Sequence, residues 1–282
     1  MSSEIELDWV TADGLKISAG LFQADSPQAF VLLAHGWGDH RGRYNKVIEY
    51  LVSSGYSVLA HDLRGHGRSE GQQGYAPGID TLSDDLLLAF QQATRLAGEL
   101  PIFLYANSFG GLLALHSLLT QPLEKLANKV QGAIVTSPLL RLSMQVPAWK
   151  VLVGKTIGKL LPRFTLKAGI DISKLSRDER VAETLLADPY RHGKICAGMF
   201  FDILRAGKQV LNSKTPLPCP VLLMHGMADT ITDCSASNLL AERQVNSIKL
   251  IMWPGLFHEL HNETGNLIVF EAAKEWLESQ IE

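Results

Sequence analysis

The sequence predicts an α/β protein built on a mainly parallel β-sheet that helices cover on both faces. Three observations predict it. Short apolar runs bounded by turn residues recur along the chain, helical patterns separate several of them, and 282 residues with 46% hydrophobic content suffice for one large core. Apolar runs of this length are typical of strands buried on both faces, and their alternation with helices favours a parallel sheet.

Eight strands are predicted, and the first two form an antiparallel hairpin. Residues 4–11 and 15–22 flank an Asp-Gly dipeptide at positions 13 and 14, which is typical of a tight turn between strands. The other six strands are the apolar runs at residues 30–34, 57–60, 102–106, 132–136, 221–224 and 248–252. Among the helical segments, residues 81–97 have acidic residues in the first turn, apolar positions on one face and a glycine after the end.

The alternation of strands and helices breaks between residues 136 and 221. This stretch has helical patterns but no convincing strand, which indicates an insertion above the sheet. We therefore expect a core formed by residues 1–138 and 216–282 and a helical cap formed by residues 139–215.

The cap is predicted to contain an amphipathic helix. Its apolar face holds Trp149, Leu152, Val153, Thr156, Ile157, Leu160 and Leu161. This face can pack onto the core, line an acyl pocket or contact lipid, and Trp149, Val153 and Ile157 are the candidate substrate-binding residues. Residues 141–214 hold 14 Lys and Arg against 6 Asp and Glu, whereas the rest of the chain holds 12 against 23. The cap is thus a candidate for peripheral contact with an anionic membrane.

The overall composition disfavours several classes of protein. A net charge of -3 argues against a nucleic-acid binder, which normally carries a basic domain. The three cysteines form no CxxC pair, so neither a disulfide framework nor a zinc cluster is expected, and a reducing cytoplasm fits best. The N-terminus lacks the features of a signal peptide, and the apolar runs are shorter than a membrane-spanning helix needs. The sequence leaves the oligomeric state open.

Ser108 lies in a segment that predicts a nucleophile elbow. Residues 102–111 predict a strand, a sharp turn and the start of an apolar helix. Such a turn forces strained backbone angles on the serine, so small residues are needed two positions before and after it, here Ala106 and Gly110. A serine that only caps a helix gives the same pattern, so the assignment depends on the rest of the chain.

Three further motifs follow predicted strands and supply the partners that a nucleophilic serine needs. The His-Gly-Trp-Gly loop after the third strand predicts an oxyanion hole from the N–H groups of Trp37 and Phe109, although an ordinary tight turn is the alternative. Asp229 follows the seventh strand in a glycine turn, and His258 follows the eighth. The order Ser108, Asp229, His258 is the nucleophile, acid and histidine order of α/β-hydrolases.

These motifs resemble those of the monoacylglycerol lipase and lysophospholipase branch of the α/β-hydrolases. The similarity is carried by residues 35–44, residues 62–69, the serine elbow, residues 226–229 and His258. It implies an α/β-hydrolase fold, with a mainly parallel eight-stranded sheet flanked by helices and a helical cap after strand six, and a cofactor-free esterase for monoacylglycerols or related acyl esters. Two positions depart from the pattern: Ala106 replaces the first elbow glycine, and Asn107 replaces a histidine common before the nucleophile.

The leading hypothesis is hydrolysis of acyl esters by a catalytic triad. Ser108 would attack, His258 would transfer the proton and Asp229 would orient the imidazole, without a cofactor or metal. Cleavage of amides or peptides stays open, because fold and triad do not choose the leaving group. A non-catalytic binding protein is a further alternative, whereas epoxide or haloalkane chemistry is disfavoured because those relatives generally place aspartate at the elbow.

Two histidine-containing motifs do not predict a metal site. The loop after the fourth strand lacks phosphate-loop spacing, so Asp62 and Arg64 are expected to bond locally within a scaffold loop. His258 and His261 are three residues apart, one fewer than the HExxH motif of zinc proteases requires. His261 and Asp233, the nearest competitors for the base and acid roles, are expected to be hydrogen-bonding or surface groups.

Overall fold

The computed structural model, which describes residues 4–120, 130–144 and 146–281, contains the predicted eight-stranded sheet. Its spatial order is β1-β2-β4-β3-β5-β6-β9-β10. The strands are β1 (Glu4–Val10), β2 (Lys16–Phe22), β3 (Ala29–Ala34), β4 (Tyr56–His61), β5 (Ile102–Asn107), β6 (Val130–Thr136), β9 (Val221–Gly226) and β10 (Ile248–Trp253). β1 and β2 form the predicted antiparallel hairpin, β2 also pairs antiparallel with β4, and the remaining neighbours are parallel. The carboxyl ends of six strands therefore meet at one edge.

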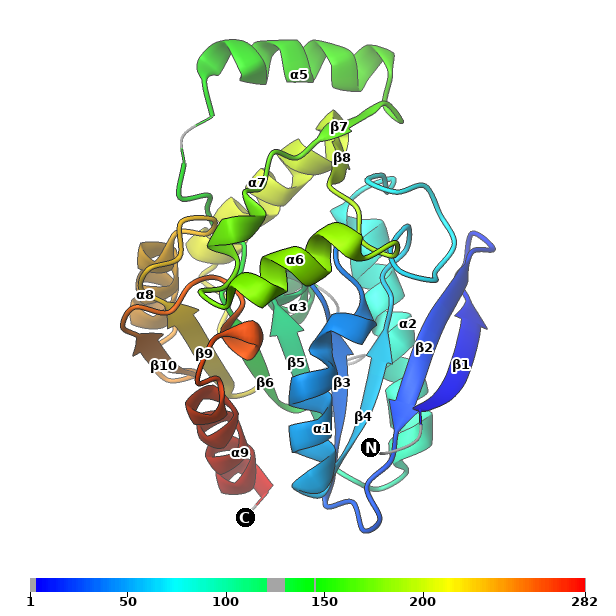
Figure 1. Cartoon of the computed structure of the whole chain (residues 1–282), viewed down its shortest axis with the longest axis vertical. Helices are drawn as coiled ribbons and strands as arrows, with labels where there is room; N and C mark the ends of the chain where they lie inside the picture. Colours follow the sequence, from blue (N-terminus) through cyan, green and yellow to red (C-terminus); the bar gives the residue numbers. More distant parts are fainter. Residues whose placement is uncertain (1–3, 121–129, 145, 282) are drawn as a thin grey trace.

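Helices cover both faces of the sheet (Figure 1). One face packs against α1 (Asn45–Ser53) and α9 (Leu267–Ile281). The other packs against α2 (Ile79–Ala97), α3 (Phe109–Thr120), α7 (Ala197–Asn212) and α8 (Cys234–Arg243). This is the sheet covered by helices on both faces that the alternation of strands and helices predicted.

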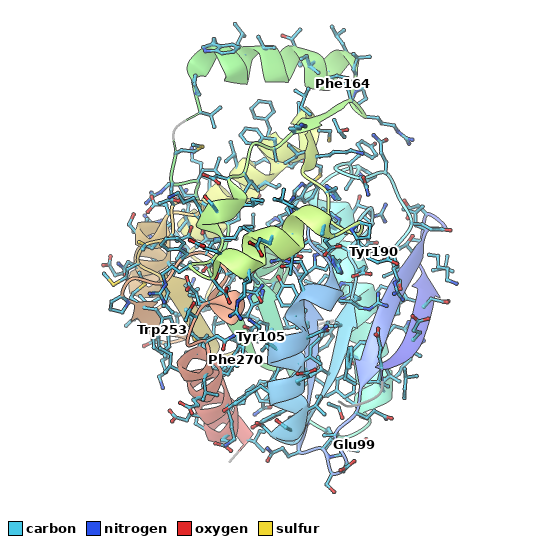
Figure 2. All side chains as sticks on the ribbon, in the orientation of Figure 1. Glu99, Tyr105, Phe164, Tyr190, Trp253 and Phe270 are labelled. Atoms are coloured by element: carbon cyan, nitrogen blue, oxygen red, sulfur yellow. The ribbon has the colours of Figure 1, made fainter. Side chains whose placement is uncertain are left out.

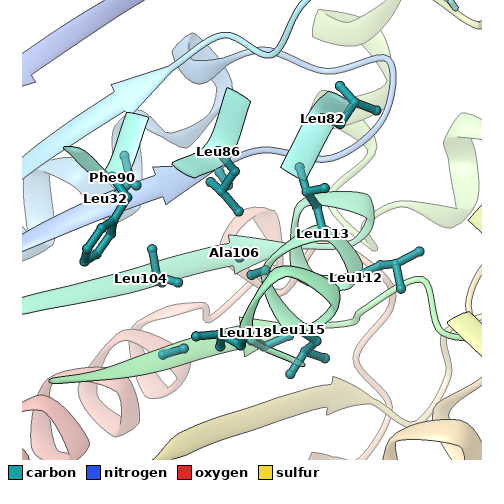
Figure 3. Packing of buried hydrophobic residues seen from close by; sticks show 14 of the residues in the cluster. Leu32, Leu82, Leu86, Phe90, Leu104, Ala106, Leu112, Leu113, Leu115 and Leu118 are labelled. Carbon is teal, nitrogen blue, oxygen red and sulfur yellow. The ribbon is translucent and has the colours of Figure 1, made fainter. Parts of the chain in front are cut away.

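The apolar runs form strands because both of their faces are buried. On β3, Leu32 joins the cluster under α2 and α3, while Val31 and Leu33 join the cluster under α1 and α9. Figure 3 shows Leu32 beside Phe90 of α2. Side chains alternate between faces with a period of two, so a strand between two helical layers must be apolar at nearly every position.

The segment between β6 and β9 is largely helical. It contains α5 (Ala148–Leu160), β7 (Thr165–Lys167), the 3₁₀ helix η2 (Ile172–Lys174), α6 (Glu179–Ala187), β8 (Lys194–Cys196) and α7. The expectation of no strand here was wrong, since β7 and β8 pair as a small antiparallel sheet. α7 lies beside α3 and contributes Met199 and Ile203 to the main core, so the last part of the predicted cap covers the sheet as core helices do. The boundary at residues 139–215 stays a prediction.

Helix α5 stands away from the sheet and rests on α7 (Figure 1). The contact is made through two small residues, because Gly154 lies against Phe201 and Gly158 lies against Ala197. Most of the predicted apolar face is instead exposed, so, of the three alternatives for this face, packing onto the core is wrong. Figure 2 shows Phe164 just beyond this helix, also far from the sheet. Within the described residues, no helix combines the length and apolar content that crossing a bilayer needs.

Candidate active site

Ser108 sits in a strained turn between β5 and α3. Its φ angle is 55°, in the left-handed region that few residues other than glycine adopt. Its side chain is half-buried, whereas its neighbours on both sides are buried. A Cβ atom at position 110 would overlap the carbonyl oxygens of Ala34 and His35, so glycine is required there. Ala106 is fully buried in the core, where its methyl group is accommodated.

Ser108, His258 and Asp229 form a continuous line of hydrogen bonds. Ser108 Oγ lies 2.8 Å from His258 Nε2, and His258 Nδ1 lies 2.7 Å from Asp229 Oδ2. The three residues follow β5, β10 and β9, which are adjacent or nearly adjacent in the parallel part of the sheet. The structure thus brings together the three side chains that the sequence nominated, in the geometry of a nucleophile, a base and an acid.

The carboxylate of Asp229 is held by more partners than the sequence suggested. Oδ1 accepts the N–H groups of Ile231 at 2.7 Å and Thr232 at 3.1 Å. Oδ2 accepts the Thr232 hydroxyl at 2.7 Å and lies 3.1 Å from His225 Nε2. Sequence reasoning missed both His225 and Thr232. Their proximity to Asp229 along the chain was the available signal.

Asp229 and His258 each stabilise the charged form of the other. Burial by itself would raise the pKa of Asp229, but the charge of His258 and hydrogen bonds from His225, His258 and Thr232 hold that pKa well below 3.8. Burial would lower the pKa of His258, yet the Asp229 carboxylate outweighs it and raises that pKa above 6.5. Asp229 is therefore ionised near neutral pH, and the His258 imidazole is a stronger base than a free one.

The N–H groups of Trp37 and Phe109 are available beside Ser108. Among the described residues, neither group donates a hydrogen bond within the protein. Gly36 comes so close that a Cβ there would lie 3.2 Å from the Ser108 Cβ, so only glycine lets the loop approach without a shift. The rings of Trp37 and Phe109 pack edge to face at 5.1 Å between centroids, which joins the two sides of the predicted oxyanion hole.

The loop after β3 is also tied to the segment between β6 and β9. Gly38 O accepts the N–H of His192 at 3.0 Å, and Trp37 Nε1 donates to Lys194 O at 2.9 Å. His66 packs against His192 with ring centroids 4.4 Å apart. Nothing in the sequence pattern related residues this far apart, and only the fold brings them together.

The residue after the candidate base is part of a buried ion pair. Glu259 accepts two hydrogen bonds from Arg43, at 2.8 and 2.5 Å, although the residues are 216 positions apart. Its N–H donates to Leu175 O at 2.7 Å. A bidentate pair of this kind fixes both side chains, so the His258 loop is anchored to the 3₁₀ helix η1 (Arg41–Tyr44) and to η2. Sequence reasoning missed this pair.

The residues set aside from the sequence lie outside the hydrogen-bonded line. Asp233 caps α8 and pairs with Arg141, as expected of a hydrogen-bonding group. His261 is fully buried and neither nitrogen has a hydrogen-bond partner among the described residues, so that expectation was wrong. In the scaffold loop, Asp62 Oδ2 accepts the N–H of Arg68 at 2.9 Å, which confirms the expected local bond. Asp62 also binds Arg41, and Arg64 binds Asp13 and Asp85, which are long-range contacts that were not expected.

The three candidate substrate-binding residues lie on α5. Trp149 is 64% exposed, Val153 is 47% exposed and Ile157 is half-buried. Trp149 and Val153 do not join the line of hydrogen bonds at Ser108. Their role in binding substrate stays a prediction.

Comparison with known proteins places this geometry in a family. A family model described as serine aminopeptidase S33 matches residues 25–265. A monoglyceride lipase of Homo sapiens is 30% identical over 276 residues, covering 95% of this chain and 88% of that protein. The chain belongs to the monoacylglycerol lipase branch of the α/β-hydrolases.

Two further relatives extend this assignment to the α/β-hydrolase fold. The crystal structure of Paleococcus ferrophilus monoacylglycerol lipase has a TM-score of 0.82 and 29% identity, covering 94% of this chain and 99% of that one. An uncharacterised abhydrolase domain-containing protein of Dictyostelium discoideum is 34% identical over 258 residues. The match covers 91% of this chain but only 27% of that protein's length. The α/β-hydrolase fold predicted from the motifs is confirmed.

Proposed function

We propose that the protein is a serine hydrolase that cleaves carboxylic esters carrying an acyl chain, with Ser108 as nucleophile, His258 as base and Asp229 as the orienting acid. The observation that carries the proposal is the unbroken line of short hydrogen bonds from Asp229 through His258 to Ser108. A serine hydroxyl is a weak nucleophile unless an adjacent base takes its proton, and this line supplies that base.

The reaction proceeds in two steps, acylation of Ser108 and hydrolysis of the acyl-enzyme. Ser108 Oγ forms a bond to the acyl carbon while His258 Nε2 takes its proton, and the N–H groups of Trp37 and Phe109 stabilise the resulting oxyanion. The bond to the leaving alcohol then breaks, and His258 returns the proton to that alcohol. Water attacks the acyl-enzyme by the same sequence and releases a carboxylic acid. These steps require no cofactor.

Monoacylglycerols or lysophospholipid-type esters are the proposed substrate class. A relative described as a monoacylglycerol lipase matches at 29% identity and one described as a monoglyceride lipase at 30%, and a Bacillus subtilis relative described as phospholipase YtpA matches at 27%. The second candidate is an amidase or peptidase on the same triad. It is favoured by the family description, serine aminopeptidase.

We further propose that α5 draws amphiphilic esters from a lipid surface. Leu160 is 74% exposed, and Trp149 and Val153 extend the same exposed apolar surface. Lys159 and Lys167 are exposed nearby, and a basic residue near an anionic membrane adds about 1 kcal/mol of attraction. In this proposal Trp149, Val153 and Ile157 contact the acyl chain during transfer.

A substrate panel with a nucleophile variant tests the chemistry. Nitrophenyl esters of rising chain length, a monoacylglycerol, a lysophospholipid and an aminoacyl amide are compared for wild type and Ser108→Ala, with fluorophosphonate labelling alongside. We expect turnover of the acyl esters, and a loss of about a millionfold with no labelling in Ser108→Ala. Labelling that persists in the variant would overturn the nucleophile assignment, and preference for the amide would favour the second candidate.

Vesicle flotation tests the lipid surface separately. Binding to anionic vesicles is expected to exceed binding to neutral ones and to weaken in high salt, because exposed charges are screened over about 8 Å at physiological ionic strength. Lys159→Glu is expected to weaken flotation, whereas Lys249→Glu, an exposed lysine on β10, is the matched control. Equal failure to float in all conditions would contradict membrane delivery and leave the triad unaffected.

A further inference from the structure

Tyr44 and Asn107 connect the nucleophile elbow to the oxyanion loop through hydrogen bonds. Tyr44 ends η1 and Asn107 ends β5, and their side chains are buried, with 0% and 2% exposed. Tyr44 Oη lies 3.1 Å from Asn107 Oδ1 and 3.2 Å from the N–H nitrogen of Gly36. Asn107 Nδ2 lies 2.9 Å from Thr136 Oγ1 and 3.3 Å from Thr136 O.

One carbonyl group fixes the direction of every bond in this connection. Thr136 O can only accept, so the Asn107 amide must turn its NH₂ group toward it. The amide oxygen then faces Tyr44, whose hydroxyl must donate to it. The same hydroxyl oxygen is left to accept the Gly36 N–H. The Gly36 N–H, the Tyr44 hydroxyl, the Asn107 amide and the Thr136 carbonyl thus each have a hydrogen-bond partner. Hydrogen bonds that follow one another in the same direction strengthen one another.

The connection ends where two catalytic elements meet. Gly36 immediately precedes Trp37, whose N–H is proposed to bind the oxyanion, and holding the Gly36 N–H restricts the loop from which the Trp37 N–H projects. At the other end, Thr136 O also accepts the N–H of Ser108 at 2.9 Å. The side chains of one tyrosine and one asparagine therefore connect the loop after β3 to the ends of β5 and β6, in addition to the backbone pairing of these strands.

The tyrosine ring is itself held in place. His261 stacks on Tyr44 with centroids 4.3 Å apart and 17° between the ring planes. Asn107 occupies the position where histidine is common in this branch, and here both ends of its amide are used. The hydrogen bond between Tyr44 and Asn107 thus gives a reason for an asparagine at this position and a partner for the buried tyrosine hydroxyl.

We propose that Tyr44 and Asn107 are positioning residues that set the Trp37 N–H relative to Ser108 for stabilisation of the oxyanion. This inference rests on the proposed serine hydrolase function. Neither side chain is assigned contact with the reacting atoms. Removing the tyrosine hydroxyl leaves the Gly36 N–H and the Asn107 amide oxygen buried without their partner, so the loop loses the bond that fixes it.

Tyr44→Phe tests the proposal, with Tyr56→Phe as its matched control. Tyr56 is also fully buried, and its hydroxyl has no hydrogen-bond partner among the described residues. It opens β4 at the opposite end of the sheet from Ser108. Tyr44→Phe is expected to lower kcat about tenfold with KM within about twofold, less than the 10²–10³ that loss of an oxyanion donor itself costs. Tyr56→Phe is expected to match wild type.

A transition-state analogue separates positioning from a merely structural role. An alkyl trifluoromethyl ketone forms a tetrahedral adduct with the serine, and its oxygen occupies the oxyanion hole. Its inhibition constant is expected to rise by the same factor as kcat/KM falls in Tyr44→Phe, while a competitive ether that forms no adduct binds as to wild type. All assays run well below the unfolding temperature of each variant.

A double-mutant cycle tests whether the two residues act together. Asn107→Leu removes both ends of the amide at similar volume and is expected to lower kcat by a factor like that of Tyr44→Phe. The double variant is expected to be no slower than the slower single variant, because both changes break one connection. Multiplied losses would contradict the shared connection.

The outcomes distinguish this proposal from the proposed function. If wild type hydrolyses esters and Ser108→Ala does not, but Tyr44→Phe equals Tyr56→Phe in kcat and in analogue binding, only the positioning proposal is overturned. If Ser108→Ala retains full activity, the proposed function fails first.

Discussion

The loops around Ser108 and helix α5 use similar apolar side chains in opposite ways. Around the serine, Ala106 and Phe109 are fully buried, and Asn107 makes hydrogen bonds at both ends of its amide. On α5, Trp149 and Leu160 face solvent, and the helix rests on α7 through glycines. Catalytic groups must be held in place before the substrate arrives, whereas a surface that binds an amphiphile, as proposed for α5, must leave its apolar area exposed.

This difference implies that the two regions can be altered independently. Ser108, His258 and Asp229 come from strand ends that the sheet fixes, whereas α5 packs against α7, away from the sheet (Figure 1). Changes around the triad should therefore abolish chemistry with every ester. Changes on α5 should affect only substrates presented in a lipid surface.

The largest expected effect separates two buried histidines of the same loop. His258→Phe should lower kcat about a millionfold, because the base that accepts the serine proton is lost. His261→Phe keeps a ring to stack on Tyr44 and should stay within about fivefold of wild type. Steady-state hydrolysis of a soluble nitrophenyl ester measures both. A reversed order would assign the base to His261.

The next effect compares two aspartates four residues apart. Asp229→Asn should lower kcat about ten-thousandfold, because the imidazole loses the carboxylate that sets its tautomer. Asp233→Asn retains a side chain able to cap α8 and should change kcat less than about threefold. Circular dichroism of both variants serves as the folding control. Comparable losses in the two variants would break the assignment of the acid.

Acid is expected to destabilise the loops of the site before it protonates ordinary carboxylates. Burial lowers the pKa of His35, His66 and His192 to about 3 and of His61 and His261 to about 4. The unfolded chain binds these protons near pH 6.5 and the folded chain does not, so their stabilisation is present above pH 6.5 and is lost as pH falls toward 3. Each contributes a slope of up to about 1.4 kcal/mol per pH unit.

Urea unfolding at pH 7.5, 6 and 5 measures this loss. The midpoint should fall steadily across the three values. A midpoint that stays constant down to pH 5 would show that these histidines are not buried as neutral groups.

The smallest effect on chemistry is expected on α5. Leu160→Ser should leave kcat/KM for a soluble nitrophenyl ester within about twofold of wild type and reduce hydrolysis of a monoacylglycerol presented in vesicles, since it removes exposed apolar area. Val245→Ser alters a side chain that is equally exposed, at 73% against 74%, but lies beyond α8. Equal losses for both variants on vesicles would argue against a specific role of α5.

The sequence by itself determined the sheet and the three candidate catalytic residues. Apolar runs specify buried strands because a strand between two helical layers is apolar on both faces. Ser108, Asp229 and His258 could be nominated because each lies in the turn or loop that follows such a run, and the carboxyl ends of parallel strands share one edge. The apolar runs and the motifs after them are each contained in a short stretch of sequence, so they can be recognised without knowing which distant segments are in contact.

The tertiary structure alone decided what holds those residues in place. The Arg43–Glu259 pair joins positions 216 apart, and the bonds of Tyr44 to Gly36 and Asn107 depend on the ends of β3 and β5 lying next to η1. Helix α5 lies with two glycines against α7 and leaves most of its apolar face exposed, which the sequence did not indicate. Periodicity predicts that a helix has an apolar face but not which neighbour, if any, covers it, because that is settled by contacts between segments distant in sequence.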